Sequence, residues 1–248
     1  MQVVNEHIDK DGFRLRGTAM SRLDGFSDVV FGFALTLLVV SLEVPHTYDD
    51  LRAVMLGFYP FAICFALFIF IWYAHFKFFR RYGLHDLTTI VINCAVLFTI
   101  LAYVYPLKFL FTQVALGTFN HYNRHVFSND LQLRELVSIY GAGFAMIYLL
   151  FSAFYWNAWR QRKNLHLNPL EITLTLASLL STMGLCIIGL LCCLLARILP
   201  PAYAGDACYV FLLALLWRPV HGLFTRRSIQ AARARTLEQD RAASAPAS

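Results

Sequence analysis

The chain has 248 residues, of which 58% are hydrophobic and only 15% are charged. A soluble domain carries about a quarter charged residues, so this composition excludes an ordinary soluble protein and indicates a membrane protein. The formal net charge of +6 gathers in particular loops. It therefore indicates membrane topology and contact with anionic lipid, and we expect no nucleic-acid partner.

The first 21 residues are polar and of mixed charge, and we expect them to form a cytoplasmic N-terminal segment, 1–21. Uncharged runs then locate the spans, because a spanning helix needs about 20 mostly apolar residues. Four runs qualify on charge alone: Ala53 to Phe76, Leu87 to Leu107, Leu136 to Trp159 and Ile172 to Ala196. Two are weaker: Val29 to Leu42, and Ala207 to Phe224, which contains Arg218 and Pro219. We expect an all-α membrane protein with six transmembrane helices in 22–225 and a basic cytoplasmic tail, 226–248.

Lysine and arginine positions predict the orientation. With both termini in the cytoplasm, 16 of these residues fall in inner segments and five in outer ones. The outer five are Arg52, Lys108, Arg124, Arg134 and Arg197. This asymmetry follows the positive-inside rule. We therefore expect a multi-pass protein of the plasma membrane with cytoplasmic N- and C-termini.

The first apolar run is short. Only 14 residues separate Asp28 from Glu43, which corresponds to about 21 Å of helix, less than the ~30 Å of hydrocarbon. Asp28, Glu43 or both must lie near or within membrane depth. Charged groups there usually face protein or water and carry function. We therefore expect the first helix to be interior.

The charges of this helix need partners on other helices. Arg22 and Asp28 are six positions apart and point about 120° away from each other on a helix. Near the same inner side, the second helix carries Trp72 and His75, and the third carries Asn93. We expect a polar cluster that joins the three helices, made of Arg22, Ser27, Asp28, His75 and Asn93. A lone interfacial histidine remains the alternative for His75.

One face of the first helix is a stripe of four residues at positions i, i+4, i+7 and i+11. They are Val29, Phe33, Thr36 and Val40. Gly32 beside them allows close helix approach. Two interpretations stay open at this point: the stripe lines a pore, or it packs against protein while Thr36 hydrogen-bonds back to the Gly32 carbonyl.

These motifs resemble a known family. The segment "RLDGFSDVVFGFALTLLVV" is similar to the signature R-x-x-x-F-S-D that opens the first helix of the transmembrane protein 175 potassium channels. The signature residues here are Arg22, Phe26, Ser27 and Asp28. Trp72 and His75 match the W-x-x-H motif of the second helix, and Asn93 to Pro106 resembles the pattern of the third. The resemblance covers about residues 20–110, and a single set of six helices is typical of the prokaryotic form.

The resemblance implies a homotetrameric bundle in which the first helix of each subunit lines a central pore. Its narrowest ring falls at Phe33 and a threonine ring at Thr36, with Val29 and Val40 on the same face. The motif residues would hold this helix in place. The family usually has Ile or Leu where this chain has Phe33, so the departure bears on conductance and selectivity.

We therefore expect a potassium-permeable cation channel with a hydrophobic constriction on the first transmembrane helix. We expect no enzyme activity, no cofactor, no metal beyond K⁺ in transit, and no partner beyond the lipid bilayer and further copies of the chain. The six cysteines lack metal-ligand spacing, and no paired carboxylates or nucleophile triad occur. Two alternatives remain open: a proton-coupled secondary cation transporter with Asp28 or His75 as the coupling group, and a non-conducting membrane scaffold.

Overall fold

The computed structural model describes residues 8–40, 46–115 and 130–244. This part of the chain is almost entirely helical. The α-helices are α1 (Arg22–Val40), α2 (Tyr48–Tyr82), α3 (Leu87–Ala115), α4 (Asp130–Arg160), α5 (Pro169–Ile198) and α6 (Phe211–Ser244). A 3₁₀ helix, η1 (Pro201–Val210), connects α5 to α6. Glu43 lies outside the described residues.

Five helices are long and apolar enough to cross a membrane within the described ranges. The segments are Phe61–Tyr82, Leu87–Phe109, Leu131–Arg160, Pro169–Ile198 and Tyr203–Glu238, the last of which runs from η1 into α6. Helix α1 is shorter, with 19 residues. The expectation of an all-α membrane protein is confirmed, and the two weakest predicted spans correspond to α1 and α6.

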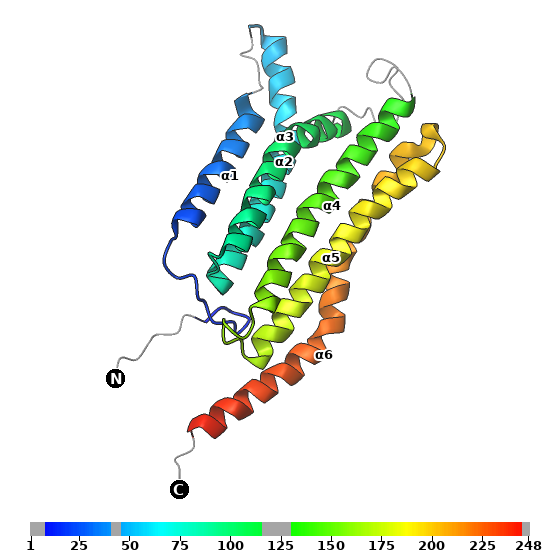
Figure 1. Ribbon diagram of the computed structural model, residues 1–248. Coiled ribbons are helices and arrows are strands. Elements are labelled where there is room, and N and C mark those ends of the chain that lie inside the picture. The colour runs from blue at the N-terminus through cyan, green and yellow to red at the C-terminus, as the bar shows by residue number, and fades with distance from the viewer. Residues whose placement is uncertain (1–7, 41–45, 116–129, 245–248) are drawn as a thin grey trace.

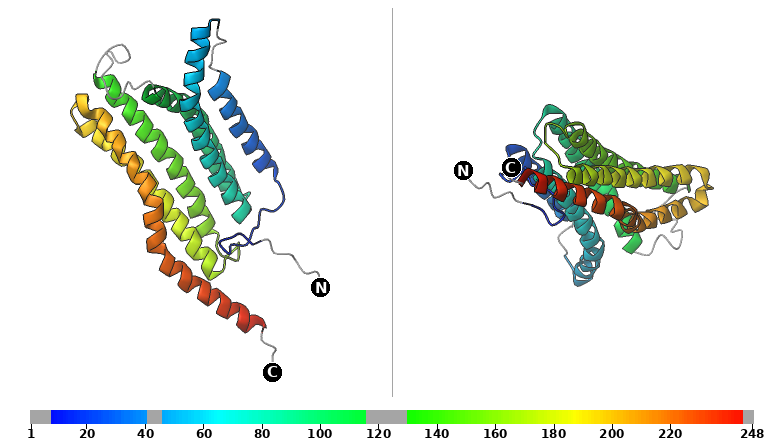
Figure 2. Two further views of the ribbon diagram at one scale, coloured as in Figure 1. Left: turned by 180° about the vertical axis from the view of Figure 1, so that it is seen from behind. Right: turned by 90° about the horizontal axis from the view of Figure 1, so that it is seen from below.

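The helices form two groups, α1 to α3 and α4 to α6, which meet where α3 packs on α4. Helix α1 packs on α2 and α3, whereas α5 lies between α4 and α6. Figures 1 and 2 show α1 and the α5–α6 pair on opposite sides of the molecule. The described chain begins and ends at the same end of the bundle, where the α2–α3 and α4–α5 connections also lie (Figure 1).

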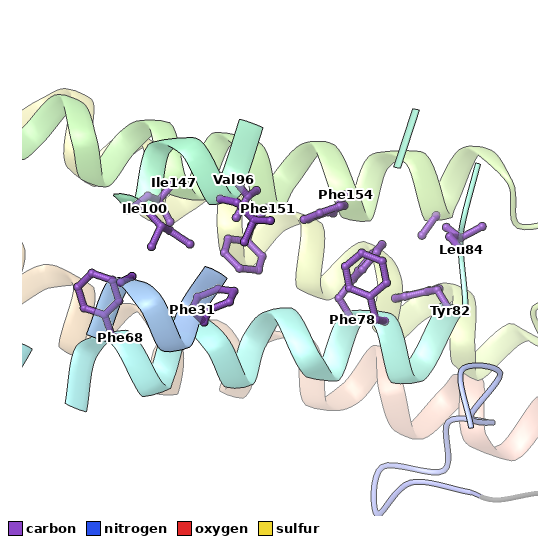
Figure 3. Close-up of a cluster of buried hydrophobic side chains, with 14 of the residues drawn as sticks. Phe31, Phe68, Phe78, Tyr82, Leu84, Val96, Ile100, Ile147, Phe151 and Phe154 are labelled. Atoms are coloured by element: carbon purple, nitrogen blue, oxygen red, sulfur yellow. The ribbon is translucent and has the colours of Figure 1, made fainter. Parts of the chain in front are cut away.

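A buried aromatic and aliphatic core joins α1, α2, α3 and α4 (Figure 3). The rings of Phe78 and Phe154 lie 4.7 Å apart at its centre, and Tyr82 adjoins Phe78 at 4.9 Å. Helix α1 contributes the buried side chains of Phe31 and Ala34 to this core. Within a membrane the alternative environment of these rings is lipid, so close van der Waals packing between them stabilises the contact of the four helices.

Helix α6 runs without a break through the boundary that the sequence predicts at residue 225, and continues to Ser244. Pro219 lies inside it, and α6 changes direction along its length in Figure 1. Proline removes a backbone N–H and its ring crowds the preceding turn, which is a common cause of a helix bend. The side chain of Arg218 lies outside the described residues.

Candidate permeation helix and its anchoring network

Three buried polar side chains from α1, α3 and α2 form one hydrogen-bonded chain. The Ser27 hydroxyl donates to the Leu23 carbonyl (2.8 Å) and accepts from the amide nitrogen of Asn93 (2.9 Å). The amide oxygen of Asn93 lies 2.6 Å from Nε2 of His75. Because an amide oxygen can only accept, His75 is the donor. The structure therefore brings together Ser27, His75 and Asn93 across three helices.

Aromatic rings surround this group of hydrogen-bonded side chains. The His75 ring lies 4.7 Å from the ring of Phe79 and 5.4 Å from that of Phe31. Ser27 and Asn93 are completely buried. A hydrogen bond in such a dry environment is stronger than in water, and leaving one partner unsatisfied costs about 1–3 kcal/mol. The network therefore fixes both the rotation and the depth of α1 against α2 and α3.

We predict that Asn93→Leu destabilises the protein by roughly 2–4 kcal/mol, because the substitution leaves the His75 N–H and the Ser27 hydroxyl oxygen without their partner. Thermal unfolding of the purified protein in detergent measures this loss. Asn164→Leu is the matched control, since Asn164 is exposed in the α4–α5 connection. An equal melting temperature for the two variants would contradict the anchoring role.

Asp28 makes a separate contact. Its carboxylate accepts a hydrogen bond from the indole Nε1 of Trp72 at 2.8 Å, so it ties the exposed side of α1 to α2. Arg22 does not join the network: it is exposed at the first residue of α1, and within the described part of the chain it forms no ion pair. Of the five residues that were expected to form one cluster, three are linked by hydrogen bonds: Ser27, Asn93 and His75. Asp28 bonds Trp72 separately, and Arg22 takes part in neither contact. Phe26 is also exposed.

On the opposite face of α1, no element of the described residues covers the side chains. Val29 is 71% and Phe33 57% exposed, and Thr36 is exposed beside them. A Cβ added at Gly32 would meet open space. The side chain of Val40 lies outside the described residues. This exposed apolar face follows the stripe that helical periodicity predicts.

The Thr36 hydroxyl does bond back to the helix, but to the carbonyl of Phe33 at 2.7 Å and not to that of Gly32. The hydroxyl hydrogen is used in this bond, while the lone pairs of the oxygen remain available as acceptors. An exposed oxygen with free lone pairs is the chemistry that replaces water around a cation. Back-bonding and ion contact are therefore compatible at this residue.

Sequence reasoning missed a clasp formed by residues 9–17, ahead of α1. The Arg16 guanidinium donates to both carboxylate oxygens of Glu171 (3.1 and 2.8 Å), which is completely buried at the start of α5. Glu171 also accepts from the backbone N–H groups of Arg14 (2.9 Å) and Asn168 (3.0 Å). The only sequence signal was the N-P-L-E capping box.

The same clasp binds the end of α2. Asp9 accepts from Arg81 at 2.7 Å, and Asp11 contacts both Arg81 and Lys77, the latter at 3.1 Å. Burial alone would raise the pKa of both aspartates, but hydrogen bonds and charge from Arg81 and Lys77 outweigh it and lower both pKa values. The carboxylates are therefore charged at neutral pH, and these ion pairs are present.

The clasp determines where α1 begins. Gly17 passes so close to α2 that a Cβ there would lie 2.3 Å from the carbonyl oxygen of Phe79, which only glycine avoids. Four residues later, Ser21 and Asp24 cap α1: the Ser21 hydroxyl accepts from the Asp24 N–H (3.1 Å), and Asp24 accepts from the Ser21 N–H (3.0 Å).

Fold and site together define a multi-pass helical membrane protein whose first helix is anchored by buried polar groups on one face and uncovered on the other. The model of a family described as the endosomal/lysosomal potassium channel TMEM175 matches residues 22–103. A curated potassium channel from Marivirga tractuosa is 38% identical over 240 residues, covering 92% of this chain and 94% of the relative. The chain belongs to the TMEM175 family.

Two solved structures share this fold. A crystal structure of a variant of the potassium channel MtTMEM175 superposes with a TM-score of 0.76 at 36% identity, covering 90% of this chain and 100% of that one. The crystal structure of a homologue, from Chamaesiphon minutus, of the lysosomal potassium-selective channel TMEM175 has a TM-score of 0.54 at 20% identity, covering 81% of this chain and 96% of that one. At that identity the second likeness shows the fold alone.

Proposed function

We propose that this chain forms a potassium-permeable cation channel, in which four copies surround a central pathway lined by the exposed face of α1. The observation that carries the proposal is the asymmetry of this helix. One face is held by the Ser27–Asn93–His75 chain, and the other is apolar and uncovered. Membership in the TMEM175 family and the description of the Marivirga relative as a potassium channel support it.

Phe33 and Thr36 have different roles along the pathway. Four Phe33 rings form an apolar constriction that excludes water when the channel is closed, since hydrophobic constrictions gate by dewetting. One turn further, the Thr36 hydroxyl oxygens partly replace the hydration shell of K⁺. Asp28 keeps α1 in place through its hydrogen bond with Trp72 and has no role in permeation. The protein resides in the plasma membrane with its clasp and C-terminus in the cytoplasm.

The test is the current across a bilayer that contains the purified protein, with K⁺ on one side and Na⁺ on the other. We expect a reversal potential displaced toward that of K⁺, and a smaller displacement for Thr36→Val because the variant loses the acceptor oxygen. Thr99→Val is the matched control, since Thr99 makes a similar back-bond, to the Ala95 carbonyl, on α3.

Three other outcomes decide against parts of the proposal. An unchanged reversal potential in Thr36→Val would leave that residue with back-bonding alone. Ion uptake that appears only with a proton gradient would indicate a transporter. The absence of any current from a well-folded protein would indicate a scaffold.

A further inference from the structure

A cavity of about 270 Å³ lies between the two helix groups, away from the exposed face of α1. Helices α2, α4, α5 and α6 line it, and Asp11 of the clasp closes one end. Helix α2 packs mainly on α1 and α3, and α6 mainly on α5, so α2 and α6 face each other across this space. The α2 residues of the lining belong to a segment apolar enough to span the membrane.

The lining changes from apolar to cationic along α2. Phe70, Ile71 and Ala74 come first, and Lys77 and Arg81 follow on the same helix face, one and two turns later. Lys77 and Arg81 belong to the last turns of α2, which ends at the same end of the bundle as the two ends of the described chain (Figure 1). The cavity thus has an apolar part and, toward the C-terminal end of α2, a charged part, which is the polarity profile of an amphiphile.

The charged part presents an ammonium and a guanidinium group. Lys77 and Arg81 line it together with the Asp11 carboxylate, while Asp9, which pairs with Arg81 and lies within 4.0 Å of Lys77, stands outside the lining. Lys77 keeps about a third of its side chain exposed despite its pairing with Asp11, so its ammonium group can reach a ligand as well. On α6, exposed Arg226 directly follows Thr225 of the lining. Basic pockets between membrane helices are typical binding sites for lipid headgroups.

One wall of the cavity contains an imidazole nitrogen that a ligand can bind. Nε2 of His221 is buried without a hydrogen-bond partner among the described residues, and His221 lines the cavity. An unsatisfied buried polar group costs about 1–3 kcal/mol. Nearby, the Ser178 and Thr182 hydroxyls donate to backbone carbonyls of α5. The Thr182 oxygen already accepts from Ser152 at 3.0 Å, so the Ser178 oxygen is the acceptor left for a ligand hydroxyl, whereas an ester carbonyl oxygen can accept only from the His221 nitrogen in its N–H form.

We propose that this cavity binds an anionic glycerophospholipid from the leaflet on the side of the clasp. The phosphate lies at Lys77 and Arg81, the glycerol and ester region lies at His221, and the acyl chains follow the apolar lining toward Phe70. The volume is slightly below the 300–1,000 Å³ of typical ligand pockets, so it holds the headgroup and upper chains while the chain ends lie in the bilayer. The bound lipid fills the space between α2 and α6.

The experiment measures lipid retention, and its readout does not depend on ion conduction. The full chain, purified in detergent, is titrated with phosphatidylglycerol or phosphatidylcholine and examined by native mass spectrometry and thermal unfolding. We expect severalfold greater retention of phosphatidylglycerol and a higher melting temperature when it is added. Equal retention of the two lipids would overturn the proposal.

Two variants test whether the lipid binds in this cavity. Ala177→Leu fills the cavity, and we expect it to abolish the preference for phosphatidylglycerol. Ala102→Leu adds the same volume at an exposed position of α3 and should leave the preference intact. His221→Leu removes the unpartnered nitrogen, so the lipid-free protein should melt at an equal or higher temperature while the lipid-induced increase shrinks.

Each remaining outcome contradicts the proposal. Undiminished phosphatidylglycerol retention in both cavity variants would place the lipid elsewhere. Loss of the oligomer in Ala177→Leu with unchanged lipid retention would show that a neighbouring copy of the chain occupies the cavity.

Discussion

Replacing Phe33 by alanine should raise the single-channel K⁺ current several-fold. On the proposed arrangement, four phenyl rings form the narrowest and most apolar part of the pathway, and their removal both widens it and lowers the cost of keeping it wet. More than half of the Phe33 side chain is exposed within its own chain. Truncation therefore leaves little cavity in the fold, and the melting temperature should be nearly unchanged.

Single-channel recording in symmetrical potassium chloride measures this effect. Phe98→Ala is the matched control, because Phe98 is also highly exposed but lies on α3. We expect its current to equal that of the unaltered protein. An unchanged current in Phe33→Ala, from channels of normal abundance, would remove Phe33 from the permeation pathway and shift attention to Val29 and Thr36.

The largest effect on stability should come from Glu171→Leu. This carboxylate is completely buried and accepts four hydrogen bonds, two of them from Arg16. Its removal leaves the Arg16 charge unpaired, a change that costs about 3–5 kcal/mol. For a chain of this size that corresponds to a fall in melting temperature of roughly 6–20 °C. Glu135→Leu, at an exposed site on α4, is the control.

A double variant separates the ion pair from simple packing. In the double variant Arg16→Met/Glu171→Leu neither charge remains. Its loss of unfolding free energy should therefore be clearly smaller than the sum of the losses in the two single variants. Additive losses would mean that the two residues act independently. Because the clasp leads directly into α1, we also expect the single Glu171 variant to shorten channel openings before it reduces assembly.

The sequence by itself predicted what depends on local pattern. Uncharged runs located the helices because the thickness of the bilayer dictates their length. A period of 3.6 residues placed Val29, Phe33 and Thr36 on one face of α1. Likewise, the polar residues of the first three helices stood out because charged and amide groups are costly in lipid and rarely persist without a purpose.

Which polar groups meet was decided only by the tertiary structure. Periodicity gives the direction of a side chain on its own helix, but a partner on another helix depends on how both helices are rotated and shifted. For that reason Asn93 binds both Ser27 and His75, while Arg22 remains outside the network.

The clasp shows the same limit over a longer distance. Arg16 and Glu171 are 155 positions apart, and no local pattern relates a polar N-terminal segment to the first turn of α5. The cavity beside His221 likewise exists only because α2 and α6 are held apart by the helices between them. Local physics therefore determined the helices and the exposed face of α1, whereas long-range packing determined what anchors that helix and what space is left to fill.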